Sequence, residues 1–391
     1  MPSTILILGA SYAGLHIAHS QDHLCMLLKD TNTVSFWSLP QLTTTTTSRL
    51  SEVSPHHNHI AYMLIQIAIV PGQLADEKVF QEIAPGFAHY PEAAFELIHG
   101  TATSLEPTTK TVNISTPSGQ NTIVYNILVL ATGSRTIGSV PWKSSLDGHE
   151  TTLSNLHKVQ EQVAAAKSIV VGGGGPTGVE TAAELAFEFS KTKEIILVTS
   201  GEELLIDSMP TSIAQGAESQ LVKMGVKVTK GVKVLTDTPT ADGKTELALS
   251  NGEKMVVDLY LPTIGVIYNT EYVPKALLDE RGQVVVDEFL RVKGAQDIWA
   301  AGDLTNVDYA QFVYCEKQAG AVAKNLDLIL KGKEAVPYKS GGGRILGLSL
   351  GRSKATGRMG NMKLPSLVVW WVKGRTLGME NLPKYISGSA F

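Results

Sequence analysis

The chain has 391 residues, which at about 100–200 residues per domain allows two or three domains. Hydrophobic residues make up 43% and charged residues 18%, a globular balance that excludes wholesale disorder. Lys and Arg number 33 against 37 Asp and Glu, and the resulting net charge of −4 offers no basic surface for nucleic acid. Cys25 and Cys315 are far apart, which excludes a disulfide scaffold, a cysteine-based zinc site and a C-x-x-C redox pair.

The beginning of the chain carries no recognisable targeting signal. Residues 1–4 lack basic side chains and lead directly into an apolar strand, and Pro2 stands where N-myristoylation requires glycine. The longest apolar stretches, residues 60–70 and 367–372, are too short to span a bilayer. We therefore expect a soluble, cytoplasmic protein.

A first strand–glycine–helix unit begins at residues 5–8 and continues through Gly9, Ser11 and Gly14. In the G-x-G-x-x-G pattern the first glycine permits a tight turn, the second admits a pyrophosphate, and the third lets the helix pack on the strand. Serine at the second position leaves the motif equally compatible with a nucleotide site and with a simple turn. Asp30, after the predicted second strand at residues 25–28, is the candidate for binding the ribose.

A second unit carries the complete pattern. A strand at residues 168–171 leads through Gly173, Gly175 and Gly178 into a helix, which indicates a dinucleotide site. The ribose-binding acid is missing from the end of the next strand, although Glu202 and Glu203 follow shortly afterwards. An acidic pair would repel a 2′-phosphate, which favours NADH over NADPH without excluding either.

Later segments have clear local signals. Asn251-Gly252 between two strand-like runs predicts a β-hairpin, and residues 311–330 predict a long helix. The glycines at 341–343 mark a hinge into a C-terminal segment. Residues 121–130 are predicted as one extended run after a turn at Ser118-Gly119-Gln120.

Three further motifs reveal a family resemblance. Ala131-Thr132-Gly133 follows a strand, Ala300-Ala301-Gly302-Asp303 follows another, and Leu261-Pro262-Thr263-Ile264-Gly265 lies between them. With the two glycine loops, the chain resembles the two-dinucleotide-domain flavoproteins of the pyridine nucleotide-disulphide oxidoreductase superfamily. The resemblance implies that Asp303 bonds the ribityl chain of FAD and that the other two motifs are the crossovers into and out of an NAD(P)H domain.

The absence of a redox cysteine pair leaves the flavin-only branches of that superfamily. The chain is most similar to fungal members of the apoptosis-inducing-factor-like, or ferroptosis-suppressor-like, group. Residues 9–14, residues 95–105 with Val112, and the tail at 368–374 carry this similarity.

The implied fold class is α/β, with two Rossmann-like dinucleotide-binding domains, the second inserted in the first, and a small α+β C-terminal domain. We expect the FAD domain at residues 1–135 and 266–332, the NAD(P)H domain at 136–265, and the C-terminal domain at 333–391.

The resemblance implies a ping-pong reaction in which NAD(P)H gives hydride to FAD, and the reduced flavin then reduces a quinone-like or other small organic acceptor. Two alternatives stay open: a flavoenzyme that tailors a secondary metabolite, and a slow-turnover flavoprotein that senses redox state. Bound FAD with negligible NADH affinity would favour the alternatives.

Glu180 is the candidate for positioning the nicotinamide carboxamide, unless it only complements the helix dipole. Lys317 is expected to contact the flavin or the acceptor, unless it lies on a solvated helix face. The residues expected at FAD are Gly9, Ser11, Tyr12, Ala13, Gly14, Asp30, Ala131, Thr132, Gly133, Gly302, Asp303 and Gln318. Those expected at NAD(P)H are Gly173, Gly175, Pro176, Thr177, Gly178, Glu180 and Gly265.

Other candidates are set aside. The histidines at 56, 57 and 59 lack acidic or thiolate neighbours, so no metal site is predicted. Trp370-Trp371 suits a membrane interface, as in tails of type II NADH dehydrogenases, but packing against the FAD domain or a second subunit is favoured. The expected partner is a small-molecule acceptor, with a homodimer left open and no nucleic acid.

Overall fold

The computed structural model describes residues 4–21, 49–54, 58–60, 64–91, 94–206, 208–340, 345–374 and 381–391. The strand predicted at residues 25–28, Asp30 and the glycines at 341–343 lie outside the described residues. The side chains of the predicted histidine cluster at 56–59 are outside them too.

A parallel sheet forms the centre of the first domain, with the order β19-β9-β1-β2-β5. Its middle strand is continuously apolar because helices or sheets cover both faces, as is usual in parallel sheets. The strands are β1 (Thr4–Leu8), β2 (Arg49–Ser54), β5 (Phe95–His99), β9 (Ile127–Leu130) and β19 (Ile298–Ala300).

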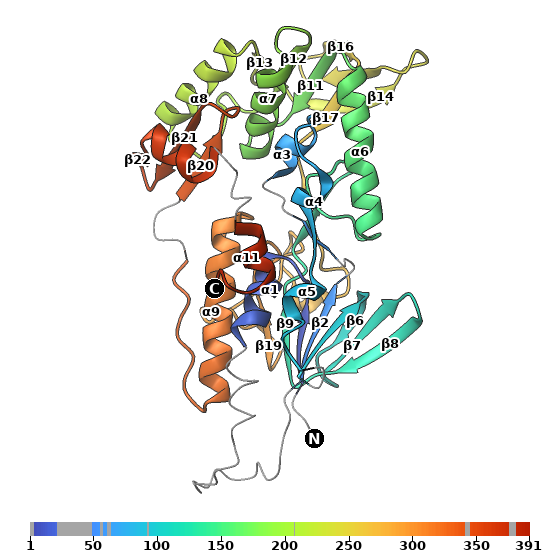
Figure 1. The fold of residues 1–391 in the computed structure, drawn as a ribbon, viewed down its shortest axis with the longest axis vertical. Helices are drawn as coiled ribbons and strands as arrows, with labels where there is room; N and C mark the ends of the chain where they lie inside the picture. Colours follow the sequence, from blue (N-terminus) through green and yellow to red (C-terminus); the bar gives the residue numbers. More distant parts are fainter. Residues whose placement is uncertain are drawn as a thin grey trace, which may run out of the picture.

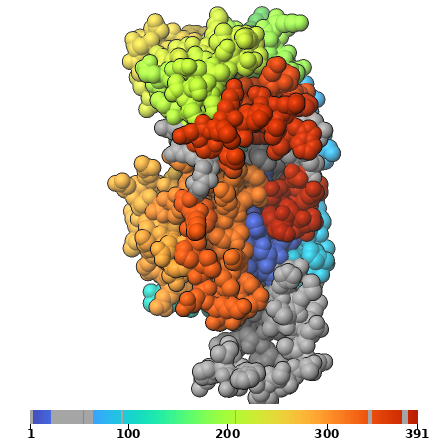
Figure 2. Space-filling view, turned by 90° about the vertical axis from the view of Figure 1, so that its left-hand side faces the viewer, coloured from blue at the N-terminus to red at the C-terminus, as the bar shows by residue number. Residues whose placement is uncertain are grey.

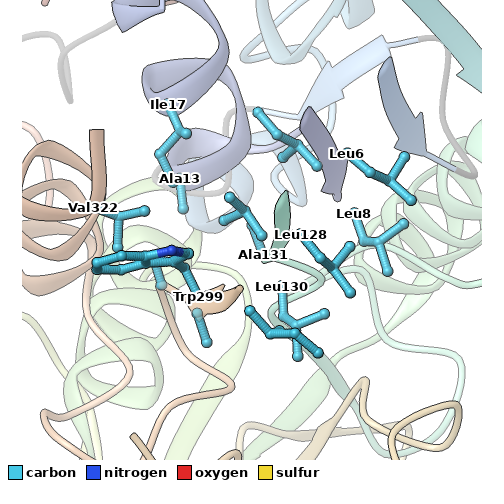
Figure 3. Close-up of a cluster of buried hydrophobic side chains, with 14 of the residues drawn as sticks. Leu6, Leu8, Ala13, Ile17, Leu128, Leu130, Ala131, Trp299 and Val322 are labelled. Atoms are coloured by element: carbon cyan, nitrogen blue, oxygen red, sulfur yellow. The ribbon is translucent and has the colours of Figure 1, made fainter. Parts of the chain in front are cut away.

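Two helices, α1 (Tyr12–Ser20) and α9 (Phe312–Leu330), pack against each other beside this sheet. Figure 3 shows Ala13 and Ile17 of α1 beside Val322 of α9, with Leu128 of β9 among the strand side chains nearby. All four side chains are buried. This packing holds the start of α1 at the carboxyl ends of the strands, where α/β folds bind their ligands.

An antiparallel sheet of β6 (Thr101–Glu106), β7 (Thr111–Thr116) and β8 (Gly119–Val124) flanks the first domain. The run predicted at residues 121–130 is therefore two strands, β8 and β9, in different sheets. The break falls at Tyr125, whose side chain is buried, and at Asn126, whose N–H donates to the Thr4 carbonyl at 2.9 Å.

The second domain repeats the parallel plan with the order β13-β12-β11-β17, flanked by an antiparallel sheet of β14, β15 and β16. The hairpin predicted at Asn251-Gly252 joins β15 to β16. The strands are β11 (Ser168–Gly172), β12 (Glu194–Val198), β13 (Lys227–Thr229), β14 (Val234–Pro239), β15 (Thr245–Leu249), β16 (Lys254–Val257) and β17 (Leu259–Pro262). Its helices are α6 (His149–Ala165), α7 (Pro176–Phe189) and α8 (Thr211–Lys223).

The chain leaves the first domain and returns to it through paired strands. β10 (Ser134–Thr136) and β18 (Val266–Tyr268) run antiparallel, and each follows a glycine with positive φ, Gly133 at 64° and Gly265 at 75°. The predicted fold class is thereby confirmed: the second Rossmann-like domain is inserted in the first.

The C-terminal segment contacts both domains. The small sheet of β20 (Ile345–Ser349), β21 (Ala355–Met359) and β22 (Met362–Lys363) contacts α7 and α8, whereas α11 (Leu382–Ile386) contacts α1. In Figure 2 the sheet and α11 form two separate red groups, the second beside blue α1 and orange α9. Between β22 and α11 in the chain come α10 (Ser366–Val369) and the π-helix η3 (Trp370–Gly374), both of which contact the small sheet.

The two neighbouring tryptophans differ in burial: Trp370 is partly buried and Trp371 is exposed. Trp370 donates its Nε1–H to the Arg352 carbonyl at 2.7 Å, while the Trp371 side chain is 64% exposed. Across the described residues, no helix combines the length and apolarity needed to cross a membrane.

Shorter elements complete the chain (Figure 1). They are β3 (Asn58–Ile60), which pairs with β4 (Phe80–Glu82), and α3 (Ile65–Ala68), α4 (Asp76–Val79), α5 (Ala84–Phe87) and the 3-10 helix η2 (Lys275–Leu277).

Candidate active site

A cavity of about 520 Å³ lies where the glycine loop after β1 meets the ends of β9 and β19. Most of the predicted FAD residues are brought together here. Gly9, Ser11, Tyr12, Ala13, Ala131, Thr132, Gly133, Gly302 and Asp303 all line it. Gly14 does not line it; it is buried in the first turn of α1.

The glycine loop is shaped by a close approach of two backbone segments. Gly9 has φ +113°, and a Cβ atom there would lie 2.3 Å from the Ala131 carbonyl oxygen. α1 begins at Tyr12, and Ser11 gives it no side-chain cap. The N–H groups of a first helical turn have no acceptor within the helix, so here they can bind an anionic group in the cavity. The loop therefore fits the pyrophosphate of FAD.

Asp303 is held as an anion at the same cavity. Its Oδ2 accepts hydrogen bonds from Ser134 Oγ at 2.8 Å and Lys143 Nζ at 2.5 Å. Burial opposes ionisation, but the Lys143 ammonium and the Ser134 hydroxyl outweigh it and lower the pKa of the Asp303 carboxyl. An ionised carboxylate can accept hydrogen bonds from a polyol such as the ribityl chain.

Gln318 lies outside the cavity and forms hydrogen bonds to the loop that lines it. Its side chain is buried, and its Oε1 accepts hydrogen bonds from the Gly302 N–H at 2.8 Å and Thr305 Oγ1 at 3.0 Å. Its amide donates to Asp308 at 3.0 Å. Gln318 thus holds the loop after β19, and it does not line the cavity.

Lys317 is not brought to the cavity. Gln311, Phe312 and Cys315 line it from α9, and their spacing of three to four residues defines one face of the helix. Lys317 lies on the opposite face, is exposed, and has its Nζ 5.9 Å from the centre of the Tyr314 ring. The structure supports the solvated alternative for Lys317.

Burial raises the pKa of the Cys315 thiol, which therefore stays protonated.

A second cavity, of about 610 Å³, lies beside the other glycine loop and is lined by residues 172–175 and by Gly265. A Cβ on Gly178 would lie 1.9 Å from the Gly173 carbonyl oxygen, so this glycine lets α7 pack on the loop. Gly175, in contrast, has no described atom within 4 Å of its Cβ position. Pro176 is the first residue of α7, where a missing N–H costs nothing.

The acid missing from the end of β12 is replaced by one a few residues later. Glu203 lines the second cavity, and within the described part of the chain its buried Oε2 has no hydrogen-bond partner. Its Oε1 accepts from Gln215 Nε2 at 3.4 Å. The structure thus places Glu203 in the wall of the second cavity, with its Oε2 buried.

Helix α7 lies between the two cavities. Its N-cap residue Gly175 lines the second cavity, and Thr177 and Glu180 in its first turns line the first. The Glu180 side chain is 6% exposed, and its Oε1 accepts from Lys373 Nζ at 2.7 Å and the Ser349 N–H at 3.0 Å. Lys373 also lines the cavity. Glu180 is therefore paired with the C-terminal segment at the cavity edge.

Aromatic and apolar side chains complete the first cavity. Tyr12 and Phe312 line it and meet edge to face, with ring centres 4.8 Å apart. Trp142 lines it too and donates its Nε1–H to the Pro262 carbonyl at 2.7 Å. In the part of the chain that the structure describes, no group of His, Cys, Asp and Glu side chains is arranged to hold a metal ion.

The cavity residues that sequence reasoning missed include Trp142, Lys143 and Lys373. Trp142 and Lys143 carry no local motif. Lys373 lies in the tail that carries the family similarity. The acidic residue Glu180 on α7 was the available hint that a cation would lie opposite.

Comparisons with known proteins agree with this geometry. A sequence profile of the pyridine nucleotide-disulphide oxidoreductases matches residues 3–319. The chain is 41% identical to oxidoreductase ptaL of Pestalotiopsis fici over 98% of this chain and 99% of that one. It is 30% identical to oxidoreductase phnG of Penicillium herquei, covering 95% and 93%, and 27% identical to human ferroptosis suppressor protein 1, covering 66% and 71%.

Solved structures show the same fold. The sulfide:quinone oxidoreductase of Aquifex aeolicus superposes with a TM-score of 0.74 at 15% identity, covering 99% of this chain and 92% of that one. The water-forming NADH oxidase of Lactobacillus brevis superposes with a TM-score of 0.70 at 18% identity, covering 92% and 76%. The chain therefore belongs to the pyridine nucleotide-disulphide oxidoreductase family and is an FAD-dependent NAD(P)H oxidoreductase.

Proposed function

We propose that this oxidoreductase transfers two electrons from NADH to a flat, mainly apolar acceptor of the quinone type. The observation that carries the proposal is the pair of aromatic rings, Tyr12 and Phe312, in the wall of the cavity that also contains the FAD loop. Aromatic side chains bind planar conjugated molecules by stacked or edge-to-face contact.

FAD, when bound, supplies the two-electron carrier that receives hydride from the nicotinamide and reduces the acceptor. The residues of this chain bind and orient it. The N–H groups at the start of α1 hold the pyrophosphate, and Gly9 keeps the loop close to β9. Asp303, kept anionic by Lys143, accepts hydrogen bonds from the ribityl hydroxyls.

NADH is the proposed donor because of Glu203. A carboxylate in the wall of this cavity can accept a hydrogen bond from a ribose 2′-hydroxyl, and it repels a 2′-phosphate. The glycine loop that leads into α7 lines the same cavity, and its backbone N–H groups hold the pyrophosphate of the dinucleotide.

Lys373 is the proposed positive group at the acceptor. Its ammonium lines the cavity while bonded to Glu180 and to the Gly347 carbonyl at 2.9 Å, so its position is well defined. A cation held in this way stabilises negative charge that develops on an acceptor oxygen during reduction.

The proposal is tested by steady-state oxidation of NADH with a naphthoquinone and, separately, with ferricyanide, which needs no aromatic binding site. Phe312→Leu should raise KM for the naphthoquinone about fivefold, since one aromatic contact is worth about 1 kcal/mol, and should leave ferricyanide reduction unchanged. Phe289→Leu, a change outside the cavity, is the matched control. If the unaltered protein reduces ferricyanide but no quinone, the acceptor class is wrong.

A further inference from the structure

Helix α7 carries a row of three glutamates at intervals of four residues: Glu180, Glu184 and Glu188. Residues four apart lie on one face of a helix, so the three carboxyl groups follow one another along α7. Glu180 lines the first cavity, whereas the Glu188 side chain is 34% exposed. The row therefore extends from the cavity to the surface.

Glu184, the middle glutamate of the row, is in an unusual environment for a carboxyl group. Glu184 is 1% exposed, and within the described residues neither carboxyl oxygen has a hydrogen-bond partner. Arg352 is the cation beside it among the described residues, and its Nε is 4.0 Å from Glu184 Oε2, too far for a hydrogen bond. Buried ionised carboxylates are normally hydrogen-bonded, so this environment favours the protonated form.

Burial and the neighbouring charged groups together bring the pKa of Glu184 close to neutral pH. Burial raises the pKa of the Glu184 carboxyl to about 7; Arg352 lowers that pKa, while Glu180 and Glu188 raise it. Arg352, in the turn between β20 and β21, is shared, since its Nη2 lies 3.8 Å from Glu188 Oε2. Lys373 of η3 acts on the row through its bond to Glu180.

Reduction of a quinone-type acceptor requires a proton that NADH does not bring. Hydride transfer supplies two electrons and one proton, and the reduced acceptor carries two protons. The balance is NADH + H⁺ + acceptor → NAD⁺ + acceptor-H₂, so one proton per turnover must come from water. The cavity wall is mainly apolar, and a bound acceptor would exclude water from it, so the proton needs a route through the protein.

We propose that Glu184 holds this proton and passes it to the cavity through Glu180, and that Glu188 at the surface reloads it. The proposal rests on the proposed function. The O–H bond of Glu184 breaks as the Glu180 carboxyl gains the proton, which then forms the second O–H bond of the reduced acceptor. Glu184 does not touch the acceptor, so its role is to supply Glu180.

The first test compares the two half-reactions in Glu184→Gln. Reduction of the flavin by NADH should keep its rate, because it needs no added proton. Reoxidation by the naphthoquinone at pH 7 should slow at least tenfold, in keeping with the 10²–10⁴-fold effects of lost proton transfer. Glu253→Gln, an exposed change in the β15–β16 hairpin, is the control.

Two neighbouring variants keep the proposal falsifiable if Glu184→Gln does not fold. Arg352→Gln removes the cation that lowers the pKa of Glu184, so the pH profile of reoxidation should move to higher pH. Glu188→Gln removes a carboxylate that raises that pKa, so the profile should move to lower pH, and because Glu188 also reloads Glu184, the maximal rate of reoxidation should fall. A residue with only a packing role would not give opposite shifts.

A readout without turnover completes the test. In protein labelled with ¹³C at the glutamate side-chain carboxyl groups, NMR should show one resonance that titrates near pH 7 and is absent in Glu184→Gln. If every glutamate titrates below about pH 5, or if the variants share one pH profile, the proposal is overturned. If NADH does not bleach the flavin at all, the proposed function itself has failed, a different outcome from an unchanged profile.

Discussion

In the first glycine loop, the critical contact is between distant strands: Gly9 lies against the carbonyl of Ala131, which follows β9. In the second loop, Gly173 at the matching position lies against Thr263, which follows β17, and Gly178 lies against the carbonyl of Gly173 within the loop. The middle position of the glycine pattern differs between the two loops. The first loop has Ser11, which lines its cavity, and the second has Gly175, which faces open space.

This difference explains why the first motif tolerates a serine. Glycine is required where backbone meets backbone, because no side chain fits there. At the middle position Ser11 borders the cavity and not another backbone segment, so a small polar side chain is accommodated. A motif that departs from the pattern at Ser11 is therefore still a complete dinucleotide loop in physical terms.

The largest expected effect tests the contact within the second loop. Gly178→Ala would place a Cβ 1.9 Å from the Gly173 carbonyl oxygen. The resulting overpacking should lower the free energy of unfolding by about 3 kcal/mol or more, despite the better helix propensity of alanine. Urea denaturation measures it. Gly175→Ala, at φ −77°, should change stability by less than about 0.5 kcal/mol and weaken NADH binding instead. Equal losses in the two variants would refute the distinction.

The contact between strands is tested by Gly9→Ala, which adds a Cβ 2.3 Å from the Ala131 carbonyl oxygen at φ +113°. We expect a loss of about 2–3 kcal/mol and reduced retention of FAD. Gly133→Ala is the control, because its φ is +64° but no described atom lies within 4 Å. The control should cost about 1 kcal/mol from backbone strain alone. Thermal unfolding and the flavin absorbance of the purified variants provide the measurements.

The acids at the two cavities differ as well, since Asp303 is paired with Lys143 and Glu203 Oε2 has no partner within the described residues. Lys143→Met should destabilise the protein by about 1–2 kcal/mol at pH 7, because a buried acceptor loses a donor.

The pH dependence of this loss follows from the pKa of Asp303. Since Lys143 holds that pKa below its unfolded value, the stabilisation is present above about pH 4 and disappears as the pH falls through the folded pKa. Unfolding free energies of the two proteins should therefore converge in acid. A constant difference down to pH 3 would contradict the ion-pair explanation.

The smallest expected effect concerns donor choice. Glu203→Gln removes the carboxylate charge and should weaken NADH binding about tenfold, or about 1.4 kcal/mol. It should weaken NADPH binding less, so discrimination between them falls. Glu202→Gln changes an exposed neighbour outside the cavity and should have little effect on either. Binding titrations with both nucleotides provide the comparison, and an unchanged ratio in Glu203→Gln would remove Glu203 from donor selection.

Much of the fold followed from the sequence because its signals are local. The apolar strand and glycines of each loop, and the Asn251-Gly252 hairpin, are each encoded within a few residues. The site depends on distant pairs that no local pattern encodes. Glu180 meets Lys373 across 193 positions, and Asp303 meets Lys143 across 160.

The long helix illustrates the same limit at finer scale. Its extent was predicted to within a residue, but which face meets the cavity depends on how α9 packs on α1. That packing directs Cys315 to the cavity and Lys317 to solvent. The domain boundaries, the acceptor and the cellular location stay predictions.

The central claim is that the first loop holds FAD and the second presents NADH to it. An anaerobic visible spectrum of the purified protein, followed by titration with NADH and then NADPH, tests it most directly. We predict a flavin band that NADH bleaches, and that NADPH bleaches only at higher concentration. Protein that contains no flavin and cannot be reconstituted with FAD would contradict the claim.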